Sequence, residues 1–394
     1  MQDFMQICQD LAPGSTVLVR VDFNLSRDYE GSWILNDRVY SVIPLVKQLL
    51  AMQFGVILVS HLGRPRAGVW EERYSLSSLC ESLEPLLGRS VNFLSSWPFQ
   101  KTYLAAGMVA LAENTRFLLG DRENDSELAK KMVESIDCVV MEAFACSHRR
   151  HASTVGLLQY AKRACLGPFH IREICGITKF LHANRPRVAY IGGKKISTKL
   201  PLLVKLLHSV EVICFGGGIA NTLLHVKGYS LGTSWVEYSF LKEVSRFCAL
   251  AERHGVQLML PVDVATTVDF NSFSHKRYVA VGDILPQECI VDVGPETVSC
   301  YCQYLLSIQS AYWNGPFGIY EYRSGTGASL QFASTLASSS VYSLIGGGDT
   351  LSLLQKNDNY EFSHVSTGGG AFLYYLANQT TPVLDAVYAG GVVG

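Results

Sequence analysis

The sequence lacks an excess of charge of either sign. It contains 33 Lys and Arg against 34 Asp and Glu, which gives a formal net charge of −1. A general electrostatic attraction to nucleic acid or to an anionic membrane surface is therefore not expected. Any basic binding site must be local.

Long apolar runs and a secretory signal are missing as well. No apolar stretch approaches the roughly 18 residues that a membrane helix requires. The opening MQDFMQICQDLAPG has no basic segment, and polar residues interrupt it. The eleven cysteines are odd in number, and Cys300-x-Cys302 has the spacing of neither a zinc knuckle nor a redox CxxC. We expect a cytoplasmic protein with mostly buried thiols, among them Cys146 as a packing residue, and no membrane or nucleic-acid partner.

Short runs of aliphatic and β-branched residues recur along the chain, and polar turns and amphipathic segments separate them. This alternation predicts an α/β fold with parallel sheets, and 394 residues suffice for two or three domains. Most runs are apolar nearly throughout, as in strands covered on both faces. The clearest predicted strands are 16–23, 54–61, 138–144, 187–193, 211–218, 257–264, 310–317 and 341–348, and the clearest helices are 124–136, 197–207 and 239–254.

The residues that follow the predicted strands differ between the two halves of the chain. Basic and polar side chains follow the strands of the first half, whereas glycine clusters follow those of the second. Ligands of open α/β sheets bind at the carboxyl ends of the strands, so the halves should bind different ligands. Gly167-Pro168 and Arg185-Pro186 bracket a predicted boundary near 165–187.

The basic residues of the first half include arginines in several separate motifs. Arginine presents a planar fork that binds phosphate or carboxylate oxygens through paired hydrogen bonds. A single arginine is more often a surface ion-pair partner, but recurrence at strand ends indicates an oxyanion site. These residues are Arg20, Arg38, His61, Arg64, Arg116 and Arg149.

The glycine clusters of the second half indicate phosphate binding at helix N-termini. GGGDT at 346–350 adds Asp349, a carboxylate suited to a magnesium ion that carries nucleotide phosphates. GGKKISTK at 192–199 supplies Lys195 and Lys199, which lie one helical turn apart. The GxxxxGK[ST] pattern is absent, and no GxGxxG follows a strand, which argues against a dinucleotide-dependent dehydrogenase.

Ten motifs occur in one order: RVDFN, SHLGRP, ENTRF, AFACSHRRHASTVG, GGKKISTK, GGGIANT, LPVD, WNGPFGIYE, GGGDT and STGGG. In this order, over about residues 16–385, they resemble phosphoglycerate kinase. The resemblance implies two similar-sized Rossmann-like lobes joined by a hinge: a substrate lobe at 1–165, a linker at 166–187, a nucleotide lobe at 188–375, and a segment at 376–394 that returns to the first lobe. It also implies a monomer whose lobes close for transfer.

The resemblance further implies which residues bind each ligand, with Arg38 and Lys195 as the catalytic pair and Asp349 as the magnesium ligand. The residues for 3-phosphoglycerate or 1,3-bisphosphoglycerate are Asp22, Asn24, Arg38, His61, Arg64, Arg116 and Arg149. The residues for ATP or ADP with Mg²⁺ are Gly193, Lys195, Lys199, Gly216, Gly217, Asn314, Pro316, Glu321, Gly348, Asp349, Thr350, Gly369 and Gly370.

The implied reaction is reversible phosphoryl transfer to the carboxylate of 3-phosphoglycerate in glycolysis. That acceptor is already ionised at neutral pH, so the site needs charge compensation and alignment, and no general base. The chain departs from the family at Ala145, where glycine is usual, at Lys194, and in a shortened stretch at 320–327. A relative that has lost turnover and acts as a binding protein is the alternative.

Overall fold

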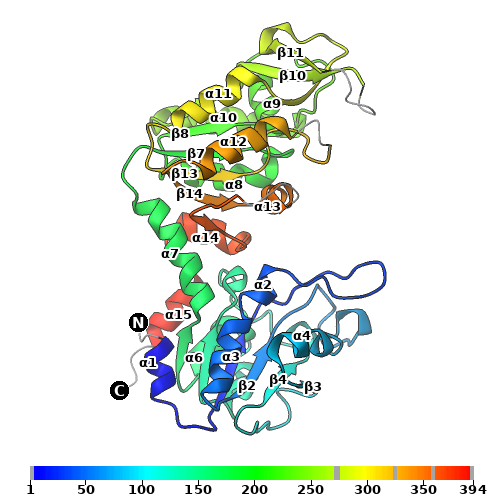
Figure 1. Ribbon diagram of the computed structural model, residues 1–394, viewed down its shortest axis with the longest axis vertical. Coiled ribbons are helices and arrows are strands. Elements are labelled where there is room, and N and C mark those ends of the chain that lie inside the picture. Colours follow the sequence, from blue (N-terminus) through cyan, green and yellow to red (C-terminus); the bar gives the residue numbers. More distant parts are fainter. Residues whose placement is uncertain (1–3, 270–275, 323–325, 356–359, 391–394) are drawn as a thin grey trace. The chain divides into compact units, whose positions relative to one another are not determined.

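The chain forms two compact units. The computed structural model describes residues 4–269, 276–322, 326–355 and 360–390, and Figure 1 traces the chain. Unit 1 is built from the chain up to Ile174 and from Asn378 onward, whereas unit 2 runs from Cys175 to Ala377. Among the described residues, no helix is long and apolar enough to cross a bilayer.

Unit 1 contains a sheet of six strands in the order β3-β4-β2-β1-β5-β6, and every neighbouring pair is parallel. The chain moves from β1 to β2 on one side and later crosses to β5 on the other. Such a reversal between neighbouring strands creates a crevice at their carboxyl ends. The strands are β1 (Thr16–Arg20), β2 (Gly55–Val59), β3 (Val91–Leu94), β4 (Val109–Ala112), β5 (Cys138–Met141) and β6 (Ala164–Leu166).

The core of unit 1 follows from the two-residue period of its strands. Val17 and Val19 of β1 pack in one apolar cluster with Val56 and Leu58 of β2, on the face that α3 and α4 cover. Leu18, on the opposite face, is fully buried too. The sheet is therefore covered on both sides, as its apolar strands predict. Helices of this unit are α1 (Phe4–Gln9), α2 (Asp37–Tyr40), α3 (Ile43–Ala51), α4 (Leu79–Leu87), α5 (Ser126–Val133), α6 (Leu157–Tyr160) and α15 (Pro382–Gly390), with the short helices η1 (Glu72–Tyr74), η2 (Thr115–Phe117), η3 (Phe144–Cys146) and η4 (Ala152–Gly156).

Unit 2 contains a second parallel sheet of six strands, in the order β15-β14-β13-β7-β8-β9. If the six strands are renumbered along the chain and the sheet is read from β9 to β15, this order is 3-2-1-4-5-6, the arrangement of doubly wound nucleotide-binding folds. The reversal lies between β7 and β13. The strands are β7 (Arg187–Ile191), β8 (Val212–Phe215), β9 (Gln257–Met259), β13 (Ser310–Asn314), β14 (Tyr342–Gly346) and β15 (His364–Val365).

The sequence did not predict the small antiparallel sheet of unit 2, which has the order β11-β10-β12. The predicted strand 257–264 instead divides into β9 and the start of β10, because the chain leaves the large sheet after Met259. A continuous apolar run cannot show such a change of sheet. The additional strands are β10 (Asp263–Thr267), β11 (Arg277–Ala280) and β12 (Cys289–Val293).

An aromatic cluster fills the core of unit 2. Trp313 of β13 lies between Phe317 and Phe332, with ring centroids 6.0 and 5.3 Å away, and all three side chains are fully buried. Helices in this unit are α8 (Ile196–Leu206), α9 (Gly217–Val226), α10 (Leu241–Arg253), α11 (Pro295–Tyr304), α12 (Gly327–Ala337), α13 (Gly348–Gln355) and α14 (Gly370–Asn378), with η5 (Tyr238–Phe240) and η6 (Val281–Asp283).

Two helices mark the ends of unit 1. Helix α7 (Pro168–His182) crosses from unit 1 into unit 2 within the predicted linker. Helix α15 packs against α6 and β6, and its Val383 N–H donates to Ser147 O at 3.2 Å. From Asn378 onward the described C-terminal segment therefore belongs to unit 1, whereas residues 376–377 belong to unit 2.

Candidate functional site

In unit 1, the predicted substrate residues follow four strands of the parallel sheet. Asp22 and Asn24 follow β1, His61 and Arg64 follow β2, Arg116 follows β4, and Arg149 follows η3 after β5. Because all the strands run in one direction, these residues lie at one edge of the sheet, next to the crevice between β1 and β5.

Arg38, Asp22 and His61 form a connected set. The Nη1 atom of Arg38 lies 3.0 Å from Asp22 Oδ2, and His61 Nδ1 lies 3.8 Å from Asp22 Oδ1. Asn36 caps α2 by accepting from the Arg38 N–H at 3.1 Å, which orients this short helix. The Arg38 side chain keeps 30% of its surface exposed, so its guanidinium can still reach a ligand.

Asn24 and Arg64 belong to neighbouring loops that a hydrogen bond joins. Asn24 Oδ1 accepts from the Gly63 N–H at 2.8 Å. Gly63 has a φ of 58°, and a Cβ there would meet the Tyr74 ring at 2.5 Å, so the turn requires glycine. The turn presents Arg64 on the surface.

Arg116 and Arg149 carry positive charge that no ion pair in the described residues neutralises. Arg116 is 8% exposed, and its buried Nε has no hydrogen-bond partner among the described atoms. Burial lowers the pKa of Arg116, and the charges of Arg122, Arg149 and Arg20 lower it further, although Asp121 opposes them. A buried guanidinium without an anion is a receptor for one.

The histidines of this region add no positive charge at neutral pH, contrary to the expectation that His61 acts as a basic residue. Burial and the charge of Arg20 hold the pKa of His61 well below its usual value. Burial and Arg149 lower the pKa of His148 to about 4, and burial and Arg116 lower that of His151 to about 4. The positive potential therefore comes from arginines alone.

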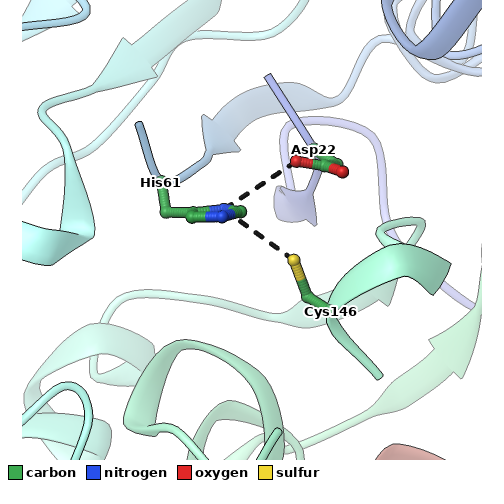
Figure 2. Close-up of side chains that lie close together, drawn as sticks. All are labelled: Asp22, His61 and Cys146. Carbon is green, nitrogen blue, oxygen red and sulfur yellow. Dashed lines mark hydrogen bonds and ion pairs between the residues drawn. The ribbon is translucent and has the colours of Figure 1, made fainter. Parts of the chain in front are cut away.

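Arg20 and Cys146 lie beside His61. The sequence counted Arg20 among the strand-end arginines without assigning it to a ligand, and it predicted Cys146 as a packing residue. Arg20 is 1% exposed, donates from Nε to Ser153 O at 2.9 Å, and places Nη2 at 3.4 Å from His61 Nδ1. The Cys146 Sγ lies 3.8 Å from the same nitrogen (Figure 2). Burial, with the charge of Asp22, raises the pKa of Cys146 to about 11, so Cys146 is a thiol at neutral pH.

Ala145 is accommodated without strain. It lies in η3 and is not among the residues with a positive φ. The departure from glycine at this position therefore leaves the backbone in an ordinary conformation.

In unit 2, Lys199 and Asn314 meet at the crevice between β7 and β13. Lys199 Nζ donates to Gly192 O at 2.7 Å, to Asn314 O at 2.8 Å and to Asn314 Oδ1 at 2.6 Å. Burial lowers the pKa of Lys199 to about 8, and the charge of Asp349 acts in the opposite direction. Lys199 therefore stabilises the two strand ends, where the sequence predicted a side chain directed at phosphates.

The glycines after β7 and β8 bring backbone segments together. Gly193 N–H donates to Pro316 O at 2.9 Å, and Gly217 N–H donates to Phe317 O at 2.7 Å. Gly217 has a φ of 63°, and a Cβ there would lie 2.8 Å from Gly193 O. Gly216 N–H donates to Ile191 O at 3.0 Å. The chain itself occupies these N–H groups, so they are not open to a phosphate.

The starts of α13 and α14 are open. A Cβ at Gly348 or Gly369 would meet nothing within 4 Å, and α14 begins at the exposed Gly370. Asp349, in the first turn of α13, is exposed and accepts from Tyr320 OH at 3.2 Å. The next residue, Thr350, is buried and accepts from the Gly315 N–H at 2.6 Å. Thr350 therefore ties α13 to the end of β13.

Two predicted residues, Lys195 and Glu321, and the additional Lys194 stand apart from these contacts. Lys195 caps the start of α8, and its exposed ammonium has no hydrogen-bond or ion-pair partner within the described ranges. Glu321 is exposed and borders residues 323–325 of the shortened stretch, which lie outside the described residues. The extra Lys194 places Nζ 4.6 Å from the centre of the Trp235 ring, a cation–π contact.

Comparisons with known proteins agree with this architecture. The family model described as phosphoglycerate kinase matches residues 9–379. A phosphoglycerate kinase from Desulfovibrio desulfuricans is 39% identical and covers 95% of this chain and 96% of its own. One from Coxiella burnetii is 37% identical, covering 93% and 94%. The Coxiella burnetii structure aligns with a TM-score of 0.89 at 36% identity, over 97% of this chain and 98% of its own.

A phosphoglycerate kinase structure from Pyrococcus horikoshii aligns with a TM-score of 0.81 at 26% identity, again over 97% and 98% of the two chains. The matches extend over both units and support phosphoglycerate kinase function in glycolysis. They do not favour the turnover-deficient alternative. The two parallel sheets, the strand-end arginines and the ordered motifs have one explanation: this chain belongs to the phosphoglycerate kinase family.

Proposed function

We propose that unit 1 binds 3-phosphoglycerate or 1,3-bisphosphoglycerate and that unit 2 binds ATP or ADP. The proposal for unit 1 rests on Arg116 and Arg149, two cationic side chains that follow strands and have no neutralising ion pair in the described residues. A phosphate would supply the missing acceptor for the buried Arg116 Nε. Arg38 and Asn24 have solvent-accessible polar groups that would bind the remaining polar groups of the glycerate.

The proposed reaction moves a phosphoryl group and no proton. A carboxylate oxygen of 3-phosphoglycerate forms the new bond to the γ-phosphorus, and the bond from that phosphorus to the β-phosphate oxygen breaks. The acceptor is ionised at neutral pH, so no base is required. His61, with its lowered pKa, is neutral and suited to hydrogen bonding. Arg38 and Lys195 would compensate the charge that spreads over the phosphoryl oxygens.

On unit 2, the open starts of α13 and α14 favour nucleotide phosphates, because the first N–H groups of a helix have no acceptor within the helix and its dipole attracts anions. Asp349 is an exposed carboxylate at the first of these starts, a hard oxygen donor of the kind that Mg²⁺ selects. Bound there, Mg²⁺ would neutralise the nucleotide's phosphates. Tyr320 holds Oδ1 of Asp349 and leaves the other oxygen for the ion.

A coupled assay of the chain with MgATP and 3-phosphoglycerate tests the activity, and absence of turnover above background would overturn it.

Calorimetry tests the proposed division of the two ligands between the units. Arg149→Met should weaken 3-phosphoglycerate binding at least about tenfold and leave MgADP binding unchanged. The neighbouring exposed Arg150→Met is the matched control and should change neither. Equal loss of both ligands in Arg149→Met would contradict the division. The resemblance to the family also favours a cytoplasmic monomer.

A further inference from the structure

Asp22, His61 and Cys146 bring three different metal-ligating atoms together. They follow β1, β2 and β5, which are neighbours in the sheet of unit 1. Their ligand atoms all lie within 4.8 Å of one another, with His61 Nδ1 at 3.8 Å from both Asp22 Oδ1 and Cys146 Sγ. Figure 2 shows the three side chains pointing toward a common centre. Tetrahedral zinc, with bonds of about 2.0–2.3 Å, requires ligand separations of about 3.3–3.8 Å.

We propose that Asp22, His61 and Cys146 bind a thiophilic divalent cation such as Zn²⁺ in a buried inhibitory site, with the fourth coordination position left to water. A thiolate, an imidazole and a carboxylate are a donor set that Zn²⁺ accepts, whereas Mg²⁺ prefers oxygen ligands alone. The site is therefore chemically distinct from the proposed magnesium position at Asp349. On binding, the Cys146 S–H loses its proton to solvent and the sulfur becomes the ligand.

The burial of the three residues supports a site that is shielded from solvent. Asp22, His61 and Cys146 are 7%, 5% and 2% exposed, respectively. Rigid strand ends and η3 set their positions, so little ordering is required when a cation arrives. An ordinary packing role would explain Cys146 alone, but it would not explain why an imidazole nitrogen and a carboxylate oxygen face the sulfur.

Nearby cations oppose the metal and set how tightly it binds. Arg20 Nη2 lies 3.4 Å from His61 Nδ1 and 3.9 Å from Cys146 Sγ, and Arg38 pairs with Asp22. The charges of Arg116 and Arg149 also act on His61, whereas His151 is neutral at neutral pH. The Asp22 carboxylate and the Cys146 thiolate balance the charge of the cation itself, so the charges of Arg20 and Arg38 weaken its binding. Arg20 Nε keeps Ser153 O, and Nη1 keeps Val21 O and Val59 O, whereas Nη2 gives up its contacts with His61 Nδ1 and Cys146 Sγ to the metal.

Occupancy would block the substrate, a consequence that depends on the proposed function. The metal would take the Asp22 oxygen and the His61 nitrogen that we assign to the glycerate site. A cation there and 3-phosphoglycerate should therefore exclude each other. Metal binding itself does not depend on that assignment.

Cobalt(II) titration of the full chain tests the binding, because a thiolate ligand gives a charge-transfer band in the near ultraviolet. We expect this band in the wild type and its loss when Zn²⁺ is added. Cys146→Ser should abolish it, and Cys146→Ala serves as a second variant that buries no hydroxyl. Cys80→Ser, another buried thiol of unit 1, is the control and should retain it. An equal band in the Cys146 variants, as from adventitious binding to other thiols, would overturn the proposal.

A kinetic experiment separates the metal site from the substrate assignment. With MgATP held constant, Zn²⁺ should inhibit turnover, and 3-phosphoglycerate should relieve the inhibition. Cys146→Ser should keep its turnover in the absence of zinc and require at least about tenfold more Zn²⁺ for half inhibition. Equal zinc sensitivity of the two proteins would overturn the inhibitory role. A cobalt band that 3-phosphoglycerate leaves unchanged would keep the metal site and contradict the placement of the substrate at Asp22 and His61.

Discussion

Lys199 Nζ lies 2.6 Å from Asn314 Oδ1, and this hydrogen bond joins α8 to the end of β13. The same ammonium also donates to the backbone oxygens of Gly192 and Asn314. Two of the three lysines of GGKKISTK therefore differ in role: Lys199 stabilises unit 2, whereas Lys195 is exposed and has no partner among the described residues.

Lys199→Met and Lys195→Met should separate these roles. Lys199→Met leaves three acceptors without their donor, so we expect the free energy of unfolding to fall by about 2 kcal/mol. Lys195→Met should leave stability unchanged and reduce turnover at least about tenfold. Denaturation midpoints and the coupled assay measure both. A stability loss in Lys195→Met as large as in Lys199→Met would contradict this division.

Arg38→Ala should impair turnover far more than folding. Its guanidinium is partly exposed and faces the proposed substrate, so we expect a loss of at least about tenfold, or roughly 1.4 kcal/mol of transition-state stabilisation. Arg150→Ala, which removes an exposed arginine of the same unit, is the control and should remain within about twofold of wild type. Nearly normal turnover combined with a much lower melting temperature in Arg38→Ala would count against the catalytic assignment.

Asp349→Asn should weaken the binding of MgADP and MgATP and leave 3-phosphoglycerate binding nearly unchanged. The amide keeps the size of the side chain and can still accept from Tyr320, but it lacks the charge that favours Mg²⁺. Calorimetry with each ligand, with and without magnesium, measures the effect. The assignment fails if magnesium-free ADP is weakened as much as MgADP.

Glu142 should make stability depend on pH. It is 2% exposed and accepts from the N–H groups of Phe169 and His170 at the start of α7. Burial raises its pKa from 4.5 to about 7, although these hydrogen bonds oppose the shift. Between these values the folded chain holds a proton that the unfolded chain releases. Protonated Glu142 therefore adds to the free energy of unfolding below pH 4.5, and this stabilisation is lost as pH rises through 7.

Comparison with Glu142→Gln isolates this effect. The stability difference between wild type and variant should fall by roughly 3 kcal/mol from pH 4.5 to pH 8. His170, whose pKa burial lowers to about 3, has the opposite effect as pH falls below 6.5, but it is common to both proteins and cancels. Urea midpoints over this range measure the difference, with exposed Glu81→Gln as the control. Parallel pH profiles for wild type and Glu142→Gln would refute the buried proton.

The sequence predicted the centres of both sheets well. Eight apolar runs correspond to β1, β2, β5, β7, β8, β9, β13 and β14, because a strand buried on both faces must be apolar along its length. Four strands of these sheets were missed, and all are short: β3 and β4 have four residues each, β6 has three and β15 has two. The predicted helices 124–136, 197–207 and 239–254 correspond to α5, α8 and α10.

The motifs placed the candidate residues at strand ends, but they could not show which N–H groups are already hydrogen-bonded within the folded chain. The N–H groups of Gly193, Gly216 and Gly217 bond to carbonyl oxygens from neighbouring strands and loops, and these partners depend on tertiary structure. Cys146 and His61 are 85 positions apart, so no local spacing could indicate their contact. Only the neighbouring positions of β2, β1 and β5 bring them together. The closure of the two lobes over their ligands stays a prediction.

The hydrogen bond from Val383 to Ser147 has a consequence for biosynthesis. Unit 2 is continuous in sequence, so it can fold while later residues are still being translated, whereas unit 1 waits for residues 382–390 to leave the ribosome. Ser147 lies directly after Cys146 and two residues before Arg149. The loop after β5, in the unit that is made first, is therefore anchored last, and in a nascent chain unit 2 can fold before this loop is secured.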